Sequence, residues 1–202
     1  MKTAALVFAF ILSLTGFGFA ADELLLIDGY EVTISGGPEG TVDFGAGNGS
    51  VVEVSGAADI VHGGKQSLKV TYDAVEGGYI YVARGFDLDA NNAGWLMKAG
   101  DISWTKYNAI AFYMYGSDSK TKIAFDIKDN GGEILRYIFE DNFKGWQQVV
   151  CLFKDFVARD DWQPQNAEKN ALLDFPIKSY QFEPLPPSKG TLYFDDAELL
   201  KK

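Results

Sequence analysis

The sequence predicts an all-β protein, either a sandwich or a barrel, and two observations carry this prediction. Apolar and polar residues alternate with period 2 through most of the chain, which is typical of strands with one buried face. Glycine-rich segments such as 63–64, 77–78 and 129–132 separate the alternating runs, and they have the composition of turns. Several short strands joined in this way are typical of sandwiches and barrels. The strands are expected at 69–72, 79–83, 109–115, 122–128, 133–140, 147–153 and 191–199.

The alternation also assigns side chains to faces. Two predicted strands place a pair of tyrosines opposite their aliphatic residues: Tyr79 with Tyr81, and Tyr113 with Tyr115. These pairs are candidates for an aromatic binding surface, or they pack under loops or at a second sheet interface.

The strand at 133–140 has an ambiguous register. Leu135 and Phe139 share the parity of Tyr137, which favours Arg136 on the outer face, whereas two isoleucines at the parity of Arg136 favour the reverse. We expect Arg136 to face outward.

The N-terminal residues resemble an export signal. Lys2 is followed by an apolar run over 4–14 and by the small-x-small site Gly18-Phe19-Ala20. The run is too short for a transmembrane helix. We expect cleavage after Ala20, a soluble periplasmic or extracellular product, and one domain over residues 21–202.

Charge and cysteine content limit the possible partners. The formal net charge is −10, and no dense basic patch occurs, so nucleic acid and anionic membranes are disfavoured. Cys151 is the only cysteine, which excludes an internal disulfide. We expect a monomer.

The sequence offers little catalytic apparatus. His62 is the only histidine and precedes a Gly-Gly turn, and Cys151 lies in a predicted strand. A two-carboxylate glycosidase from Asp126, Glu140 and Asp141 is the remaining enzymatic alternative, and we expect a non-catalytic protein. The segments 45–49 and 87–92 are predicted to be a flexible turn and a polar loop.

A series of short motifs covers nearly the whole chain from Ile27 onward. In chain order they are Ile27-Asp28-Gly29-Tyr30-Glu31, the segment 63–70, Trp104-Thr105-Lys106-Tyr107, Phe143-Lys144-Gly145-Trp146 and the segment 194–199. Their order resembles the carbohydrate-binding modules of family 11, within the galactose-binding-domain-like jelly rolls. This resemblance implies a jelly-roll β-sandwich that binds a β-glucan-type polysaccharide. Residues 38–60 have no counterpart in the pattern.

The same framework occurs in the complex I intermediate-associated protein 30 family. The alternative reading is therefore a secreted domain for protein interaction or assembly, which would use the same face for a protein partner. A sugar site would be concave and aromatic, whereas a protein site would be flatter and broader.

The resemblance also implies a set of sugar-binding residues. The segment 159–164 resembles a loop that carries an Asp-Tyr-Gln-Pro run, so Trp162 is expected to be a binding aromatic. Its alternative role is to cap the end of the sandwich. The predicted platform and its polar contacts are Tyr79, Tyr81, Tyr113, Tyr115, Asp126 and Arg136. For Asp126 and Arg136 the alternative is a solvated strand face.

Related jelly rolls commonly hold calcium where the first and last strands meet. Glu31 and Asp195 occupy the matching positions, and carboxylate oxygens suit calcium. The resemblance thus implies a structural calcium ion, with Asp28 or Asp196 as substitute ligands. The alternative is a pair of surface acids.

Overall fold

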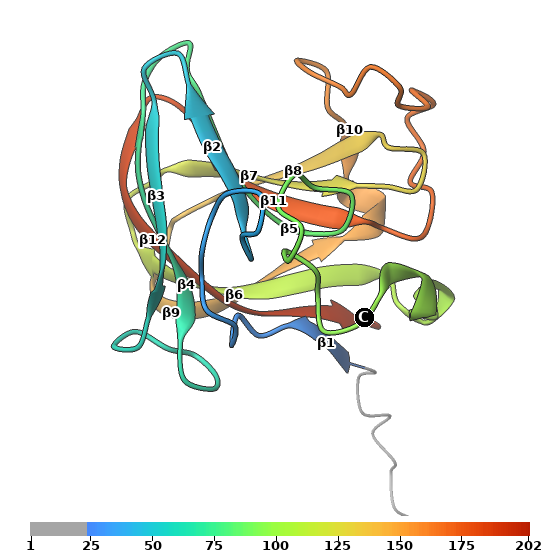
Figure 1. Cartoon of the computed structure of the whole chain (residues 1–202), viewed down its shortest axis with the longest axis horizontal. Helices are drawn as coiled ribbons and strands as arrows, with labels where there is room; N and C mark the ends of the chain where they lie inside the picture. The colour runs from blue at the N-terminus through green and yellow to red at the C-terminus, as the bar shows by residue number, and fades with distance from the viewer. Residues whose placement is uncertain (1–23) are drawn as a thin grey trace, which may run out of the picture.

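A computed structural model describes residues 24–202 as two packed antiparallel sheets (Figure 1). Sheet A contains, in spatial order, β3 (Val51–Ala57), β4 (Ser67–Ala74), β12 (Ser188–Leu200), β6 (Ala109–Ser117) and β9 (Lys144–Leu152), with β1 (Leu24–Asp28) also paired to β12. Sheet B contains β10 (Val157–Ala158), β8 (Ile134–Glu140), β7 (Lys122–Lys128), β11 (Ser179–Pro184), β5 (Tyr79–Gly85) and β2 (Asp43–Gly47). Three 3-10 turns complete the described elements: η1 (Ala99–Asp101), η2 (Trp104–Lys106) and η3 (Phe153–Asp155). The predicted all-β sandwich is confirmed.

Each of the seven strands predicted from alternation is present. The alternation did not identify β1, β2, β3, β10 or β11. Residues 38–60, which had no counterpart in the motif pattern, contain β2 and β3, two consecutive strands that belong to different sheets and so connect them.

The expected flexible turn over residues 45–49 is wrong in its first part. Gly45 and Gly47 belong to β2 and pair with Tyr81 and Tyr79 of β5. The turn proper is Asn48-Gly49, where both residues have positive φ (54° and 92°), as tight hairpin turns require. Glycine is depleted in strands, which is why local composition favoured a turn throughout.

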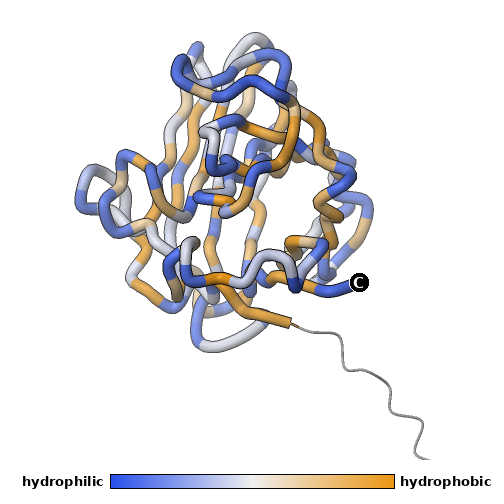
Figure 2. The backbone as a smooth tube through the Cα atoms, turned by 90° about the vertical axis from the view of Figure 1, so that its right-hand side faces the viewer, coloured by the Kyte–Doolittle hydropathy of each residue, from blue (hydrophilic) through white to orange (hydrophobic). Residues whose placement is uncertain are grey.

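The core lies between the sheets and is rich in phenylalanine. Phe182 of β11 stacks on Phe194 of β12 with ring centroids 3.7 Å apart, and Phe112 of β6 packs on Phe125 of β7 at 4.7 Å. Figure 2 shows the hydrophobic stretches in the strands and the hydrophilic stretches concentrated at the connecting turns. The strands therefore enclose a core rich in phenylalanine between the two sheets.

The structure shows which face of β8 each side chain occupies. Tyr137 packs on buried Phe156 with ring centroids 5.8 Å apart. Arg136 faces outward, where it pairs with Asp126 of β7. The expected orientation of this strand is confirmed.

A buried polar network joins the sheets. Asp28, at the end of β1, accepts two hydrogen bonds from the Arg84 guanidinium of β5, at 2.7 and 2.8 Å. The Tyr180 hydroxyl of β11 donates to the same carboxylate at 2.9 Å and lies 2.7 Å from the Tyr30 hydroxyl. Burial, followed by the charge of Asp28, raises the pKa of both tyrosines. The Asp-Gly-Tyr of the first motif thus supplies a cross-sheet tie.

The predicted signal peptide and its cleavage site after Ala20 lie outside the described residues. Within residues 24–202, no helix has the length and hydropathy to cross a membrane.

The Asp28–Arg84 pair has a testable consequence for stability. Replacing Arg84 with Ala leaves a buried carboxylate without its partner, which typically costs about 3–5 kcal/mol. We expect Arg84→Ala to lower the free energy of unfolding by this amount in urea titrations. Lys189→Ala, which removes an exposed pair with Asp73, should change it by less than about 1 kcal/mol. Equal effects of the two substitutions would contradict the structural role of the buried pair.

Candidate functional site

A cleft of 690 Å³ lies on the outer face of sheet B. One wall comes from β5 and the loop 87–89, and the other from the loop that follows β10. Figure 1 shows β2 and β3 on one side of this face and the segment after β10 on the other. The residues that line it include Tyr79, Tyr81, Asp126, Arg159, Asp161, Trp162, Gln181 and Glu183.

The first wall is made by two tyrosines of β5. Tyr79 and Tyr81 face outward because Ile80 and Val82, which alternate with them, are buried in the core. The Tyr79 side chain is 47% exposed. Burial, with the nearby charges of Asp43 and Asp89, raises the pKa of Tyr81. The Tyr81 phenol therefore enters the cleft uncharged at neutral pH.

The second wall carries Trp162, whose side chain is 57% exposed. The guanidinium carbon of Arg159 lies 5.9 Å from the centroid of the Trp162 ring system, within the range of a cation–π contact. Arg159 also donates to both oxygens of Asp161, at 2.6 and 3.0 Å. These hydrogen bonds lower the pKa of Asp161. Trp162 is thus exposed on a segment held by its neighbours.

Gln163 fastens the same segment to sheet B. Its side-chain oxygen accepts from the Ile134 N–H at 2.8 Å, and its side-chain nitrogen donates to the Ile134 carbonyl at 2.8 Å and to the Arg159 carbonyl at 2.9 Å. The amide therefore pairs with the β8 backbone as another strand would. This pairing sets the position of Trp162, the residue before it.

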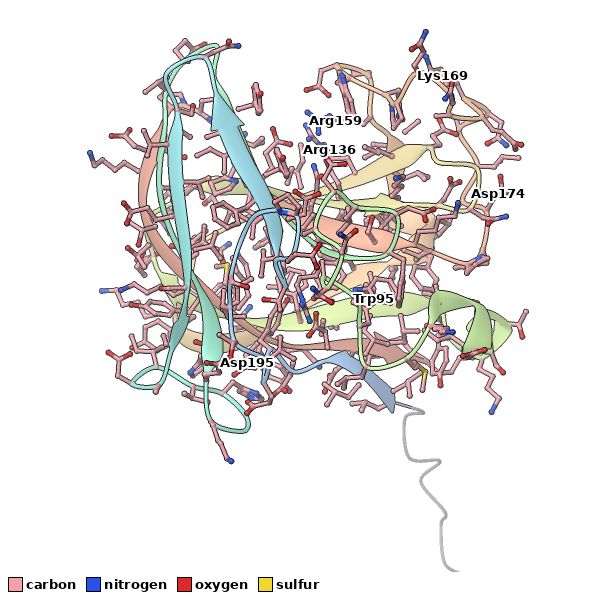
Figure 3. The ribbon with its side chains drawn as sticks, in the orientation of Figure 1. Trp95, Arg136, Arg159, Lys169, Asp174 and Asp195 are labelled. Carbon is pink, nitrogen blue, oxygen red and sulfur yellow. The ribbon has the colours of Figure 1, made fainter. Side chains whose placement is uncertain are left out.

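The floor of the cleft is an ionic network of Asp126, Arg136, Arg159 and Glu183. Arg136 donates to both oxygens of Asp126, at 2.8 and 2.9 Å, and also to Glu183. Arg159 reaches Asp126 and Glu183 at 3.1 Å each. Gln181 donates to Asp126 at 3.1 Å. Figure 3 shows Arg136 and Arg159 directed into the same space between the β2 strand and the loop after β10.

Burial in the floor changes the ionisation of its groups. Burial raises the pKa of Glu183, against the opposing charges of Arg136 and Arg159. Burial disfavours the charged form of Arg136, but its hydrogen bonds to Asp126 together with the charges of Asp126, Glu183 and Asp161 outweigh this effect and raise its pKa. Asp126 is 1% exposed and the Arg136 side chain 13%. Asp126 and Arg136 were predicted to contact sugar. In the structure, the polar groups of these two residues are hydrogen-bonded to each other.

The expected four-tyrosine platform is wrong, because Tyr113 and Tyr115 belong to sheet A. Both lie on β6, while the cleft lies over sheet B. The Tyr113 ring stacks on His62 with centroids 3.5 Å apart, and Tyr115 packs edge-on against Trp146 and Tyr193. Alternation gave the correct face of each strand but could not show that β5 and β6 are in different sheets.

Sequence reasoning gave no role to several residues of the cleft. Gln181 and Glu183 lie on β11, whose segment Ser179-Tyr180-Gln181-Phe182-Glu183 alternates with period 2. This alternation is a local signal from which the strand could have been predicted. Arg159 and Gln163 stood next to Trp162 in the motif, but their partners on β7, β8 and β11 are distant in sequence and left no local signal.

Three residues considered for catalysis, Asp141, Cys151 and His62, are buried or make contacts that support the fold. Burial opposes ionisation of Asp141, but hydrogen bonds from Ser119 and Ser117 lower its pKa, and these bonds fix the turn before β7. Burial raises the pKa of Cys151 above its usual range, so the thiol stays protonated. His62 contacts Asp196 at 2.7 Å and lies on Tyr113.

The predicted calcium ligands lie on two sides of the loop 62–66. Asp195 is fully buried and accepts from the N–H groups of His62 and Gly63 at 2.9 and 3.1 Å. Glu31 accepts from the Lys65 N–H at 2.9 Å. Burial raises the pKa of Asp195 to about 6. As arranged, these carboxylates serve as acceptors for the loop backbone, and residues 24–202 contain no group of three acidic, His or Cys side chains placed to hold a metal.

The chain is a β-sandwich of the carbohydrate-binding class, as its match to a family model shows. The model of the carbohydrate binding domain (family 11) matches residues 19–202, and the chain belongs to this family. No curated protein gives a significant match. The family assignment covers the whole described region.

Solved structures share the fold at low sequence identity. The family 11 module of the cellulosomal cellulase Lic26A-Cel5E of Clostridium thermocellum is 18% identical, with a TM-score of 0.65, over 91% of this chain and 97% of that chain. A family 11 module of the same organism in complex with a β-1,3-1,4-mixed-linked tetrasaccharide is 19% identical, with a TM-score of 0.65, over 90% and 97%. The family 30 module of the cellulase Cel9D-Cel44B of that organism is 12% identical, with a TM-score of 0.53, over 90% and 98%. These likenesses support the sandwich fold.

The role of Gln163 can be measured directly. Gln163→Ala removes three hydrogen bonds between the Trp162 segment and β8, and we expect faster hydrogen exchange at the Ile134 N–H and a loss of about 1–3 kcal/mol of stability. Gln147→Ala, at an exposed position of β9, should change neither. Unchanged exchange at Ile134 in Gln163→Ala would contradict the fastening role.

The calcium site stays a prediction from the sequence, and melting temperature tests it. If calcium binds at Glu31 and Asp195, adding it to chelator-treated protein should raise the Tm, because a ligand that binds only the folded state stabilises it. Asp195→Asn should abolish the rise. A Tm that does not respond to calcium in the unsubstituted protein would reject the prediction.

Proposed function

We propose that this protein is a non-catalytic module that binds a β-glucan-type polysaccharide in the cleft over sheet B. The observation that supports this most is the position of three exposed or half-exposed aromatic side chains, Tyr79, Tyr81 and Trp162, around one cleft. A pyranose ring has an apolar C–H face that packs on aromatic rings and a rim of hydroxyl groups that needs polar partners. The cleft offers both kinds of contact.

The polar contacts come from groups at the edge of the ionic floor. Asp161 is 54% exposed on its side chain, so one carboxylate remains accessible beside Trp162. Gln181 and Lys128 line the cleft between the two walls. Carboxylates accept hydrogen bonds from sugar hydroxyls, and Gln and Lys donate them. These groups complement a hydroxyl rim without requiring a charged sugar.

The choice of β-glucan rests on the family. A family 11 module of Clostridium thermocellum has been solved with a β-1,3-1,4-mixed-linked tetrasaccharide, and we extend that substrate class to this chain as a proposal. The concave shape of the cleft favours a sugar chain over the broad, flat contact of a protein partner. The sequence resemblance to an export signal supports placing this binding in the periplasm or outside the cell.

Affinity electrophoresis tests the proposal. Gels that contain mixed-linked β-glucan should retard the protein, whereas xylan and mannan gels should not. Trp162→Ala should weaken binding by about tenfold or more, since loss of an aromatic contact costs over about 1.4 kcal/mol when it includes area burial.

Trp146→Ala is the matched control, because it removes a tryptophan from the outer face of sheet A. It should leave retardation unchanged. No retardation of the unsubstituted protein by any glucan would reject β-glucan binding, and release of reducing ends from the glucan would reject the non-catalytic assignment.

A further inference from the structure

The edge strand beside the tyrosine wall has glycine at two of its three outward positions. On β2, the outward positions are Asp43, Gly45 and Gly47, while Phe44 and Ala46 pack against the core. Gly45 pairs with Tyr81, and Gly47 pairs with Tyr79. The two glycines are thus the direct cross-strand neighbours of both wall tyrosines.

The phenol ends of the tyrosines occupy the space that side chains at these positions would fill. A Cβ atom built on Gly47 would lie 2.5 Å from Cζ of Tyr79, and one built on Gly45 would lie 2.9 Å from Cε1 of Tyr81. Real Cβ atoms do not approach this closely, so the rings lean across β2 and rest on its backbone. Any side chain at 45 or 47 must displace a ring.

Glycine in the interior of a strand lowers the stability of the fold, so its presence there needs a compensating role. It weakens the strand because the unfolded chain is more flexible and because no side chain packs there. Neither position has a positive φ, so backbone conformation does not demand glycine. What does require it is the close approach of the two rings.

We propose that Gly45 and Gly47 are positioning residues of the sugar site, which hold Tyr81 and Tyr79 against β2 in the orientation that contacts the sugar. The inference rests on the proposed sugar binding and identifies what sets one wall of the cleft. A ring whose phenol end is supported by backbone loses less freedom on binding, so more of its contact energy appears as affinity.

A double-mutant cycle tests the proposal. We would measure the Kd for a mixed-linked β-glucan oligosaccharide by calorimetry in Gly47→Ala, Tyr79→Ala and the double variant. Each single substitution should weaken binding about threefold to tenfold, the range expected for one aromatic contact. The double variant should bind no more weakly than Tyr79→Ala, because the glycine acts only through the ring.

Two further variants provide controls. Gly45→Ala should behave like Gly47→Ala, with Tyr81→Ala as its partner, and it serves as the test if Gly47→Ala does not fold. Gly100→Ala, where a Cβ would meet open space, should leave the Kd unchanged. Thermal melts of all variants report any loss of folded protein separately from loss of affinity.

The outcomes distinguish this inference from the proposed function. If Tyr79→Ala weakens binding while Gly47→Ala does not, or if their effects add fully, the glycines have only a structural role and the inference fails. If neither tyrosine variant changes the Kd but Trp162→Ala does, the cleft stands and the inference fails. If Trp162→Ala also leaves the Kd unchanged, the cleft itself is not the site and both fail.

Discussion

The ionic network of Asp126, Arg136, Arg159 and Glu183 is the interaction on which the cleft depends. Its two carboxylates come from neighbouring strands of sheet B, β7 and β11, and one guanidinium comes from β8. The second guanidinium, Arg159, belongs to the segment that carries Trp162. Buried charges are tolerated only when they are paired and hydrogen-bonded. The network therefore couples the floor of the cleft to the position of its tryptophan wall.

The walls are held by two different physical devices. Trp162 is fixed by charge and hydrogen bonds, since Arg159 lies against its ring and Gln163 pairs with the β8 backbone. Tyr79 and Tyr81 are fixed by shape, since their phenol ends rest on β2 at Gly47 and Gly45, where no side chain intervenes. Both devices order aromatic rings before any ligand arrives. Preorganisation of this kind lowers the entropic cost of binding a flexible polysaccharide.

The sheets themselves are tied by a second buried pair, Asp28 with Arg84. Arg84 lies on β5 on the same face as the core residues Ile80 and Val82, and Tyr180 on β11 donates to the same carboxylate. The tie thus joins the first strand of sheet A to two strands below the cleft. The same two strands, β5 and β11, therefore contribute both to the stability of the sandwich and to the geometry of the site.

Much of the fold was predictable because alternation is a local property. The parity of Ile80 and Val82 correctly placed Tyr79 and Tyr81 on an outer face, and the parity of Leu135 and Phe139 correctly oriented Arg136. Parity does not say which sheet a strand joins, and Tyr113 and Tyr115 were misplaced for that reason.

Other features of the site depend on contacts between distant segments. The partners of Arg159 lie 33 and 24 positions away, on β7 and β11. The partner of Gln163 is 29 positions away. The glycines of β2 looked like a turn because their strand depends on tyrosines from β5 rather than on their own propensity. No local pattern encodes these contacts.

The most direct test is an NMR titration of the ¹⁵N-labelled protein with a mixed-linked β-glucan oligosaccharide. If the cleft over sheet B is the sugar site, the Trp162 indole N–H and the backbone amides of β5, β7 and β11 should shift, while the Trp146 indole and the amides of Tyr113 and Tyr115 should not. Shifts confined to β6, β9 and β12 would place sugar binding on the outer face of sheet A and contradict the central claim.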